Sequence, residues 1–104
     1  PARGRLQFEW LHRFVALAEA HGLQLRPYLG YTPEWAARRG GRDADVWNNP
    51  PARPADWERF AGAIADALRR YDHVRSYEIY NEENVAQWWD GSPAEYAEVL
   101  VRGA

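Results

Sequence analysis

Apolar residues recur at helical spacing in two segments of the chain. Between Leu6 and His21 they fall three or four positions apart, and Gly22 follows, the residue type that most often comes directly after a helix. The spacing returns between Pro54 and Tyr71, behind a proline whose missing N–H costs little in a first turn. We therefore predict two amphipathic helices. Their expected buried stripes are Leu6, Trp10, Leu11, Phe14, Val15 and Ala18, and then Trp57, Phe60, Ala61, Ile64, Leu68 and Tyr71.

A short apolar run of strand length follows each of these helices. The runs are Leu23 to Gly30 and Val74 to Tyr80. Pro27 weakens the first run as a strand, because a proline cannot donate a hydrogen bond to a sheet ladder. The order helix, glycine, strand is nevertheless typical of an αβ unit. The alternation predicts an α/β fold in which two parallel strands are joined by a crossover helix.

A third helix is predicted from a capping box. Ser92 is the residue type that caps a helix, Pro93 suits the first helical position, and Glu95 can reach back to the backbone of the cap. The helix should therefore begin at Pro93. Its apolar positions, Tyr96, Val99 and Leu100, are expected to face the core.

The second strand ends in polar residues that could carry chemistry. It reaches Asn81 and Glu82, and a loop with Trp88 and Trp89 follows. A carboxylate at the C-terminal tip of a strand, beside exposed aromatic side chains, is typical of carbohydrate sites in α/β barrels. We expect Glu82 to be partly withdrawn from water there, as a general acid requires. An ordinary strand that runs into a polar turn is the alternative, but it leaves this clustering unexplained.

The segment from Tyr31 to Arg53 is a long loop rich in turn residues. It exceeds the usual connection of about 2 to 6 residues, and long loops in compact domains are often functional. Because C-terminal strand ends share one edge of a parallel sheet, this loop and the one from Glu82 to Gly91 should converge. Trp35 and Trp47 could serve there as platforms for sugars, or they could anchor the loop to the body of the protein.

Three stretches of the chain resemble a known family. Tyr77 to Asn84, with Trp88 to Pro93 after it, resembles the fourth strand of clan A glycoside hydrolases, where an aromatic-Asn-Glu-Pro-Asn motif carries the acid/base glutamate. Leu29 to Ala36 is similar to the exit of the third strand in the β-xylosidase and iduronidase-like members, and Pro54 to Tyr71 is similar to the joining helix. The resemblance implies that residues 1–104 are one fragment of a (β/α)8 barrel.

The same resemblance implies a retaining glycoside hydrolase acting on a carbohydrate substrate. Asn81 would hydrogen-bond the sugar 2-hydroxyl, and Glu82 would protonate the leaving oxygen. The nucleophile of the clan is a second glutamate on the seventh strand, which this chain does not include. The substrate-binding residues expected from the loops are Tyr31, Trp35, Trp88 and Trp89, together with Asn81.

Two positions depart from the motif of the clan. Tyr80 stands where Trp is usual, and Glu83 stands where Pro is usual, so that a second carboxylate lies beside the proposed acid. These departures keep open a second interpretation, in which the domain is a degenerate barrel that binds carbohydrate without hydrolysing it. A glutamate at a seventh-strand tip in a longer reading frame would favour the enzyme.

Length and composition bound these interpretations. The chain has 104 residues and no Met, whereas a (β/α)8 barrel needs about 250 residues, so we expect a fragment. A formal net charge of -2 and interspersed charges predict no nucleic-acid partner, and no apolar run predicts a membrane span. There is no Cys, and the three His residues are scattered, so we expect neither a metal nor a cofactor. Nothing in the sequence indicates a cellular compartment.

One buried ion pair is also expected. Glu78 lies inside the second strand, and a carboxylate facing the interior of a barrel would need a partner. Arg26 on the preceding strand is the candidate partner.

Overall fold

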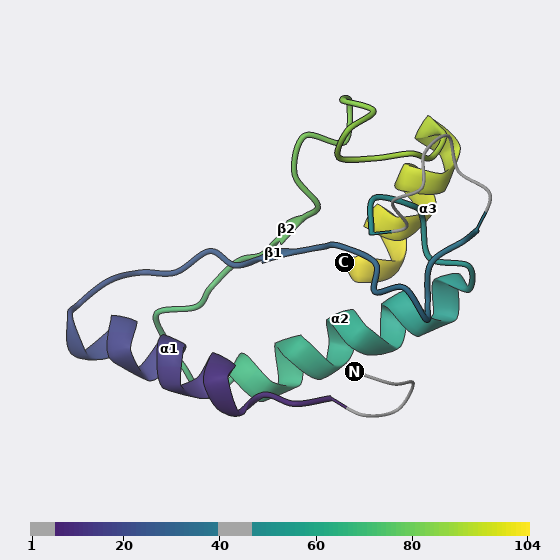
Figure 1. Cartoon of the computed structure of the whole chain (residues 1–104). Helices are drawn as coiled ribbons and strands as arrows, with labels where there is room; N and C mark the ends of the chain where they lie inside the picture. The colour runs from purple at the N-terminus through teal and green to yellow at the C-terminus, as the bar shows by residue number, and fades with distance from the viewer. Residues whose placement is uncertain (1–5, 40–46) are drawn as a thin grey trace.

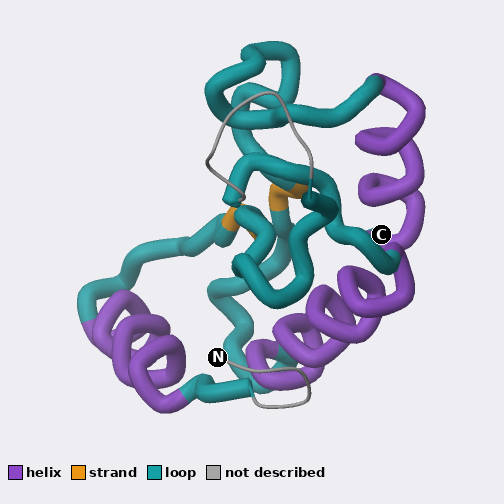
Figure 2. The backbone as a smooth tube through the Cα atoms, turned by 45° about the vertical axis from the view of Figure 1, so that its right-hand side comes forward, coloured by secondary structure: helices purple, strands orange, loops and turns teal. Residues whose placement is uncertain are grey.

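Three helices and a two-stranded parallel sheet make up the part of the chain that the computed structural model describes, residues 6–39 and 47–104. The elements in order are α1 (Glu9–Ala20), β1 (Tyr28–Leu29), α2 (Pro54–Leu68), β2 (Glu78–Ile79) and α3 (Pro93–Gly103). Helices α1 and α2 lie on one side of the short sheet, and α3 stands at the end of α2 (Figures 1 and 2).

The two strands are paired in parallel, as the sequence predicts. Tyr28 lies opposite Glu78, and the pairing continues towards the N-terminal side with an isolated parallel bridge between Leu25 and Val74. Pro27 takes part through its carbonyl oxygen, which accepts from the N–H of Glu78 at 3.0 Å, so its missing N–H is not needed on this side. The strands are shorter than the apolar runs that predicted them.

Helix α2 supplies the centre of the core. Its buried side chains are Trp57, Ala61, Ile64 and Leu68, as its spacing predicts. The indole N–H of Trp57 donates to the carbonyl oxygen of Val99 at 2.9 Å, which ties α2 to α3. Because this bond satisfies the polar edge of a buried tryptophan, the aromatic area can be buried without leaving a donor unpaired.

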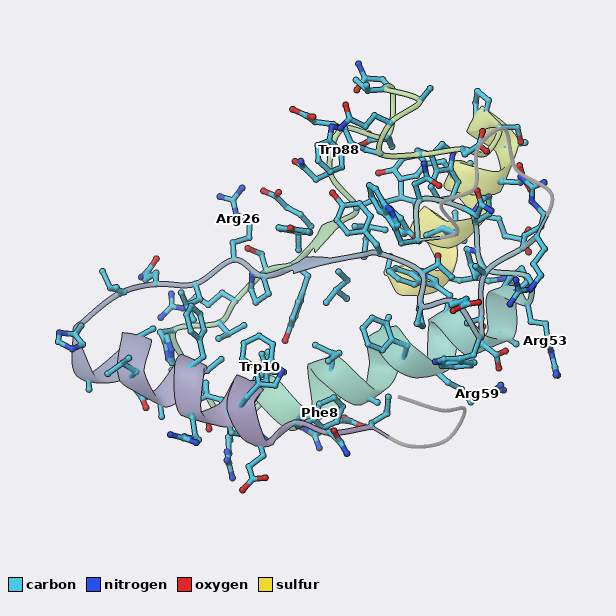
Figure 3. All side chains as sticks on the ribbon, in the orientation of Figure 1. Phe8, Trp10, Arg26, Arg53, Arg59 and Trp88 are labelled. Atoms are coloured by element: carbon cyan, nitrogen blue, oxygen red, sulfur yellow. The ribbon has the colours of Figure 1, made fainter. Side chains whose placement is uncertain are left out.

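The predicted stripe of α1 is only partly buried, and this prediction was wrong for its outer half. Val15 and Ala18 are buried, whereas the side chains of Trp10 and Phe14 are 68% and 54% exposed. The helix begins at Glu9 rather than at Leu6. Trp10 and Phe14 line an open groove of about 700 Å³ between α1, α2 and the segment around β1. Trp10 is labelled in Figure 3.

The capping box of α3 forms as predicted. The Ser92 side chain accepts from the N–H of Glu95, and the Glu95 carboxylate accepts from the N–H of Ser92 at 2.8 Å. Val99 is buried, but Leu100 is 44% exposed, so the predicted core face of this helix is narrower than the sequence indicated. Within the described ranges, no helix is long and apolar enough to cross a membrane.

Candidate functional site

The exits of β1 and β2 lie side by side because the strands are parallel and in register. The N–H of Tyr80 donates to the carbonyl oxygen of Leu29 at 2.8 Å. Two residues beyond the end of β1, the ring of Tyr31 meets that of Tyr80 edge to face, with centroids 5.9 Å apart. The loop after β1, called the first loop (residues 30–53), and the loop after β2, called the second loop (residues 80–92), therefore start from the same point.

Tyr31 brings two of the predicted site residues together. Asn81 and Glu82 both lie close enough to the Tyr31 phenol to affect its pKa. The pKa of Tyr31 is raised, first by partial burial and then by the neighbouring Tyr28 and the Glu82 carboxylate, while Asn81 lowers it. An Asn amide and a carboxylate thus face the same phenol at the tip of β2.

Three aromatic rings flank this point, and we call Tyr31, Trp47 and Trp88 the aromatic cluster. The ring centroids of Tyr31 and Trp47 are 5.1 Å apart, those of Trp47 and Trp88 are 5.7 Å apart, and those of Tyr31 and Trp88 are 6.1 Å apart. Trp47 and Trp88 are half-buried. The convergence of the two loops is as predicted, and Trp47 belongs to the cluster rather than only to the body of the protein.

The backbone of the second loop turns sharply at its start. Tyr80 and Glu82 have φ angles of 59° and 53°, in the left-handed region that costs non-glycine residues about 1 kcal/mol or more. The two neighbouring glutamates diverge there: Glu82 raises the pKa of Tyr31, whereas Glu83 lies beside Tyr96 and raises the pKa of that phenol. The Tyr96 hydroxyl also donates to the carbonyl oxygen of Ile79 at 3.0 Å.

The expected withdrawal of Glu82 from water is not found in the described part of the chain, where this residue is exposed. The neighbouring Glu83 is half-buried instead. Glu82 lies in the sharp turn that opens the second loop, where its φ angle is 53°. The carboxylate is therefore reachable from solvent.

Trp89 and Trp35 do not join the cluster. Trp89 is only 3% exposed, and its ring packs between Tyr80 and Tyr96 at centroid distances of 5.0 and 5.8 Å. Trp35 is 38% exposed and lines a separate groove of about 680 Å³ between the first loop and α2. Of the four predicted aromatic contacts, the structure brings Tyr31 and Trp88 together and leaves these two elsewhere.

Ionic and metal-binding features are few in this region. Arg26 and Glu78 form the expected pair, with Nη1 3.0 Å from Oε1, but their side chains are 65% and 50% exposed rather than buried. Among the described residues, no group of three or more His, Cys, Asp or Glu side chains could hold a metal ion.

Two features of the site were not predicted from the sequence. Glu83, in the turn, lies beside Tyr96, 13 positions further along the chain in α3, and no local pattern in the sequence predicts this contact. Asn48 and Asn49, which follow Trp47 in the segment that the sequence predicts as a turn-rich loop, are buried. A scan against protein-family models and searches of curated proteins and of solved structures return no match for this chain.

Proposed function

We propose that this chain is part of the catalytic domain of a retaining glycoside hydrolase, with Glu82 as the general acid/base. The observation that supports it most is the meeting of Asn81 and Glu82 with Tyr31 where two paired parallel strands end. A polar strand tip beside an aromatic cluster is the arrangement that α/β barrels use to bind and cleave sugars. The (β/α)8 barrel itself is part of the proposal.

Glu82 has two successive tasks in this mechanism. Its protonated carboxyl donates a proton to the glycosidic oxygen as the bond to the anomeric carbon breaks. After the glycosyl group has passed to the nucleophile, the Glu82 carboxylate removes a proton from the water that releases the sugar. The nucleophile would be a glutamate about 5 to 5.5 Å away, on a later strand that residues 1–104 do not include.

The remaining residues bind and orient the sugar. As the family resemblance implies, the Asn81 amide would hydrogen-bond the 2-hydroxyl. The half-buried ring of Trp88 offers an apolar face to the C–H groups of a sugar, and the phenol of Tyr31 is placed to hold Asn81 in position. Trp47, in contact with Trp88, extends that apolar surface.

Kinetics of a longer chain that contains the nucleophile would test the role of Glu82. Glu82→Gln should lose about 100-fold or more in kcat/KM on aryl β-glycosides with poor leaving groups, and much less where the leaving group needs no proton. Glu83→Gln is the matched control, because Glu83 faces Tyr96, and it should retain activity on both. Equal loss on both substrates in Glu82→Gln would contradict the acid/base role.

A second candidate function is carbohydrate binding without hydrolysis. The exposure of Glu82 and the substitution of Pro by Glu83 favour it. A titration of the longer chain with oligosaccharides, monitored by tryptophan fluorescence, distinguishes the two functions. Binding without any turnover, unaffected by Glu82→Gln, would identify the non-catalytic protein.

A further inference from the structure

Arg38 is held firmly within the first loop by its backbone. Its N–H donates to the carbonyl oxygen of Pro50 at 2.8 Å, and its own carbonyl oxygen accepts from the Asn49 side-chain amide at 2.7 Å. Asn49 is only 1% exposed. Because buried amide bonds of this kind are costly to leave unmade, the start of the Arg38 side chain has a fixed position.

The guanidinium of Arg38 reaches from the first loop to the end of the second. Its Nη2 donates to the carbonyl oxygen of Asp90 at 3.1 Å, and its Nε lies 3.2 Å from Oε1 of Glu95. The other oxygen of that carboxylate accepts from the N–H of Ser92 in the capping box. One side chain therefore joins the first loop, the second loop and the first turn of α3.

A backbone link beside Arg38 reinforces this connection. The N–H of Asp90 donates to the carbonyl oxygen of Asn48 at 2.9 Å, and the Asn48 amide donates to the carbonyl oxygen of Gln87 at 3.2 Å. Gln87 and Asp90 bracket Trp88, while Asn48 directly follows Trp47. The bonds thus fix the two chain segments that carry the facing indoles.

We propose that Arg38 is a positioning residue that holds Trp88 against Trp47 and thereby sets the affinity of the aromatic cluster for a carbohydrate. The consequence for affinity rests on the proposed function, whereas the placement of Trp88 does not. Arg38 contacts Asp90 and Glu95, and it acts on the aromatic cluster through these two residues. Loss of its guanidinium removes the contacts with Asp90 and Glu95, leaves the bonds of Asn48 as the remaining link between these segments, and lets the two indoles shift relative to each other.

Fluorine NMR of the chain labelled with 5-fluorotryptophan tests the placement without any ligand. Arg38→Met should shift or broaden the resonance of Trp88, assigned with Trp88→Phe, and leave that of Trp57 in the core unchanged. Arg39→Met is the matched control, because Arg39 pairs with Glu34 at 3.2 Å within the first loop and its side chain is 69% exposed. An unchanged Trp88 resonance in Arg38→Met would overturn the proposal.

A second variant covers the case in which Arg38→Met disturbs the whole fold. Arg38→Lys keeps the charge near Glu95, but a single ammonium cannot reproduce the fork of a guanidinium. It should also move the Trp88 resonance and not that of Trp57. If Arg38→Lys leaves Trp88 in place, the guanidinium does not position it.

Binding gives the functional readout on the same variants. For a parent protein that binds xylo-oligosaccharides, Kd should rise about tenfold in Arg38→Met and stay unchanged in Arg39→Met. Equal weakening in both variants would count against a specific role of Arg38. A parent protein that binds no oligosaccharide would count against the proposed function, while the NMR result still decides the placement of Trp88.

Discussion

The hydroxyl groups of Thr32 and Tyr80 lie 2.7 Å apart, and both residues are buried, at 4% and 3% exposure. This hydrogen bond joins the first loop to the residue that follows β2. The ring of Tyr80 also contacts Tyr31 of the aromatic cluster. The bond therefore links the start of the first loop to the start of the second.

Replacing Tyr80 with Phe should destabilise the chain by about 1 to 2 kcal/mol, because the Thr32 hydroxyl loses its buried partner. The double variant Tyr80→Phe with Thr32→Val should cost less than the sum of the single changes, since both partners are then apolar. Urea denaturation measures these free energies. Tyr28→Phe, at a residue that is 52% exposed, is the control and should stay within about 0.5 kcal/mol of the parent. Additive effects would mean that the two hydroxyls do not interact.

Stability should also fall at alkaline pH because of Tyr80. Burial raises its pKa to about 12, although the bond with Thr32 acts in the opposite direction. Below about pH 10 the phenol is protonated in both states, so folding is unaffected. Between about pH 10 and 12 the unfolded chain loses the proton first, and about 3 kcal/mol of stability is lost. Urea unfolding from pH 9 to 12 should show a shallower fall in Tyr80→Phe, and identical slopes would contradict the assignment.

Glu82 and Glu83 should each control the ionisation of a different tyrosine. Burial raises the pKa of Tyr96, and the neighbouring Glu83 raises it further. Glu83→Gln should therefore lower the pKa of Tyr96, because a negative neighbour disfavours the phenolate. Glu82→Gln should lower the pKa of Tyr31 in the same way. Carbon-13 NMR of labelled tyrosine rings follows both, and a shift of Tyr31 in Glu83→Gln would show that the glutamates do not diverge.

The parts of the fold that the sequence predicted well are those decided locally. The capping box of Ser92 and Glu95 needs only neighbouring residues. The predicted stripe of α2 is buried at Trp57, Ala61, Ile64 and Leu68 and half-buried at Phe60, and α3 packs against this helix. The stripe of α1 has the same spacing, yet Trp10 and Phe14 are exposed. Periodicity tells which face is apolar, but whether that face is buried depends on elements far away in the sequence.

The candidate site shows the same division. Parallel pairing was enough to predict that the first and second loops converge, because strand ends share an edge. The sequence could not show that Trp88 joins the aromatic cluster while Trp89 is buried against Tyr80 and Tyr96. Adjacent loop residues follow no periodicity, and the direction of each side chain depends on the local backbone. The sequence also could not place Glu83, because the left-handed turn at Glu82 sets its direction.

Gly91 should tolerate no side chain, because the second loop passes close to the first at this point. An added Cβ would lie 2.6 Å from Cγ of Pro50 and 2.7 Å from the ring of Trp89. Gly91→Ala should cost about 1 to 3 kcal/mol in urea denaturation. Gly62→Ala is the control: it lies within α2, an added Cβ meets nothing within 4 Å, and alanine should stabilise the helix by up to about 1 kcal/mol. Equal effects of the two changes would contradict the close approach.

The neighbouring tryptophans Trp88 and Trp89 should respond to truncation in opposite ways. Trp89 is buried against Tyr80 and Tyr96, so Trp89→Ala should cost about 3 to 5 kcal/mol and lower the unfolding midpoint sharply. Trp88 is half-buried in the aromatic cluster, so Trp88→Ala should cost less stability and lose most of the affinity for oligosaccharides. Circular dichroism in urea and a fluorescence titration measure the two effects on the same samples. Because the residues are adjacent, a general disturbance of the second loop would weaken folding and binding in both variants, whereas the proposed division gives a folded variant without affinity only for Trp88.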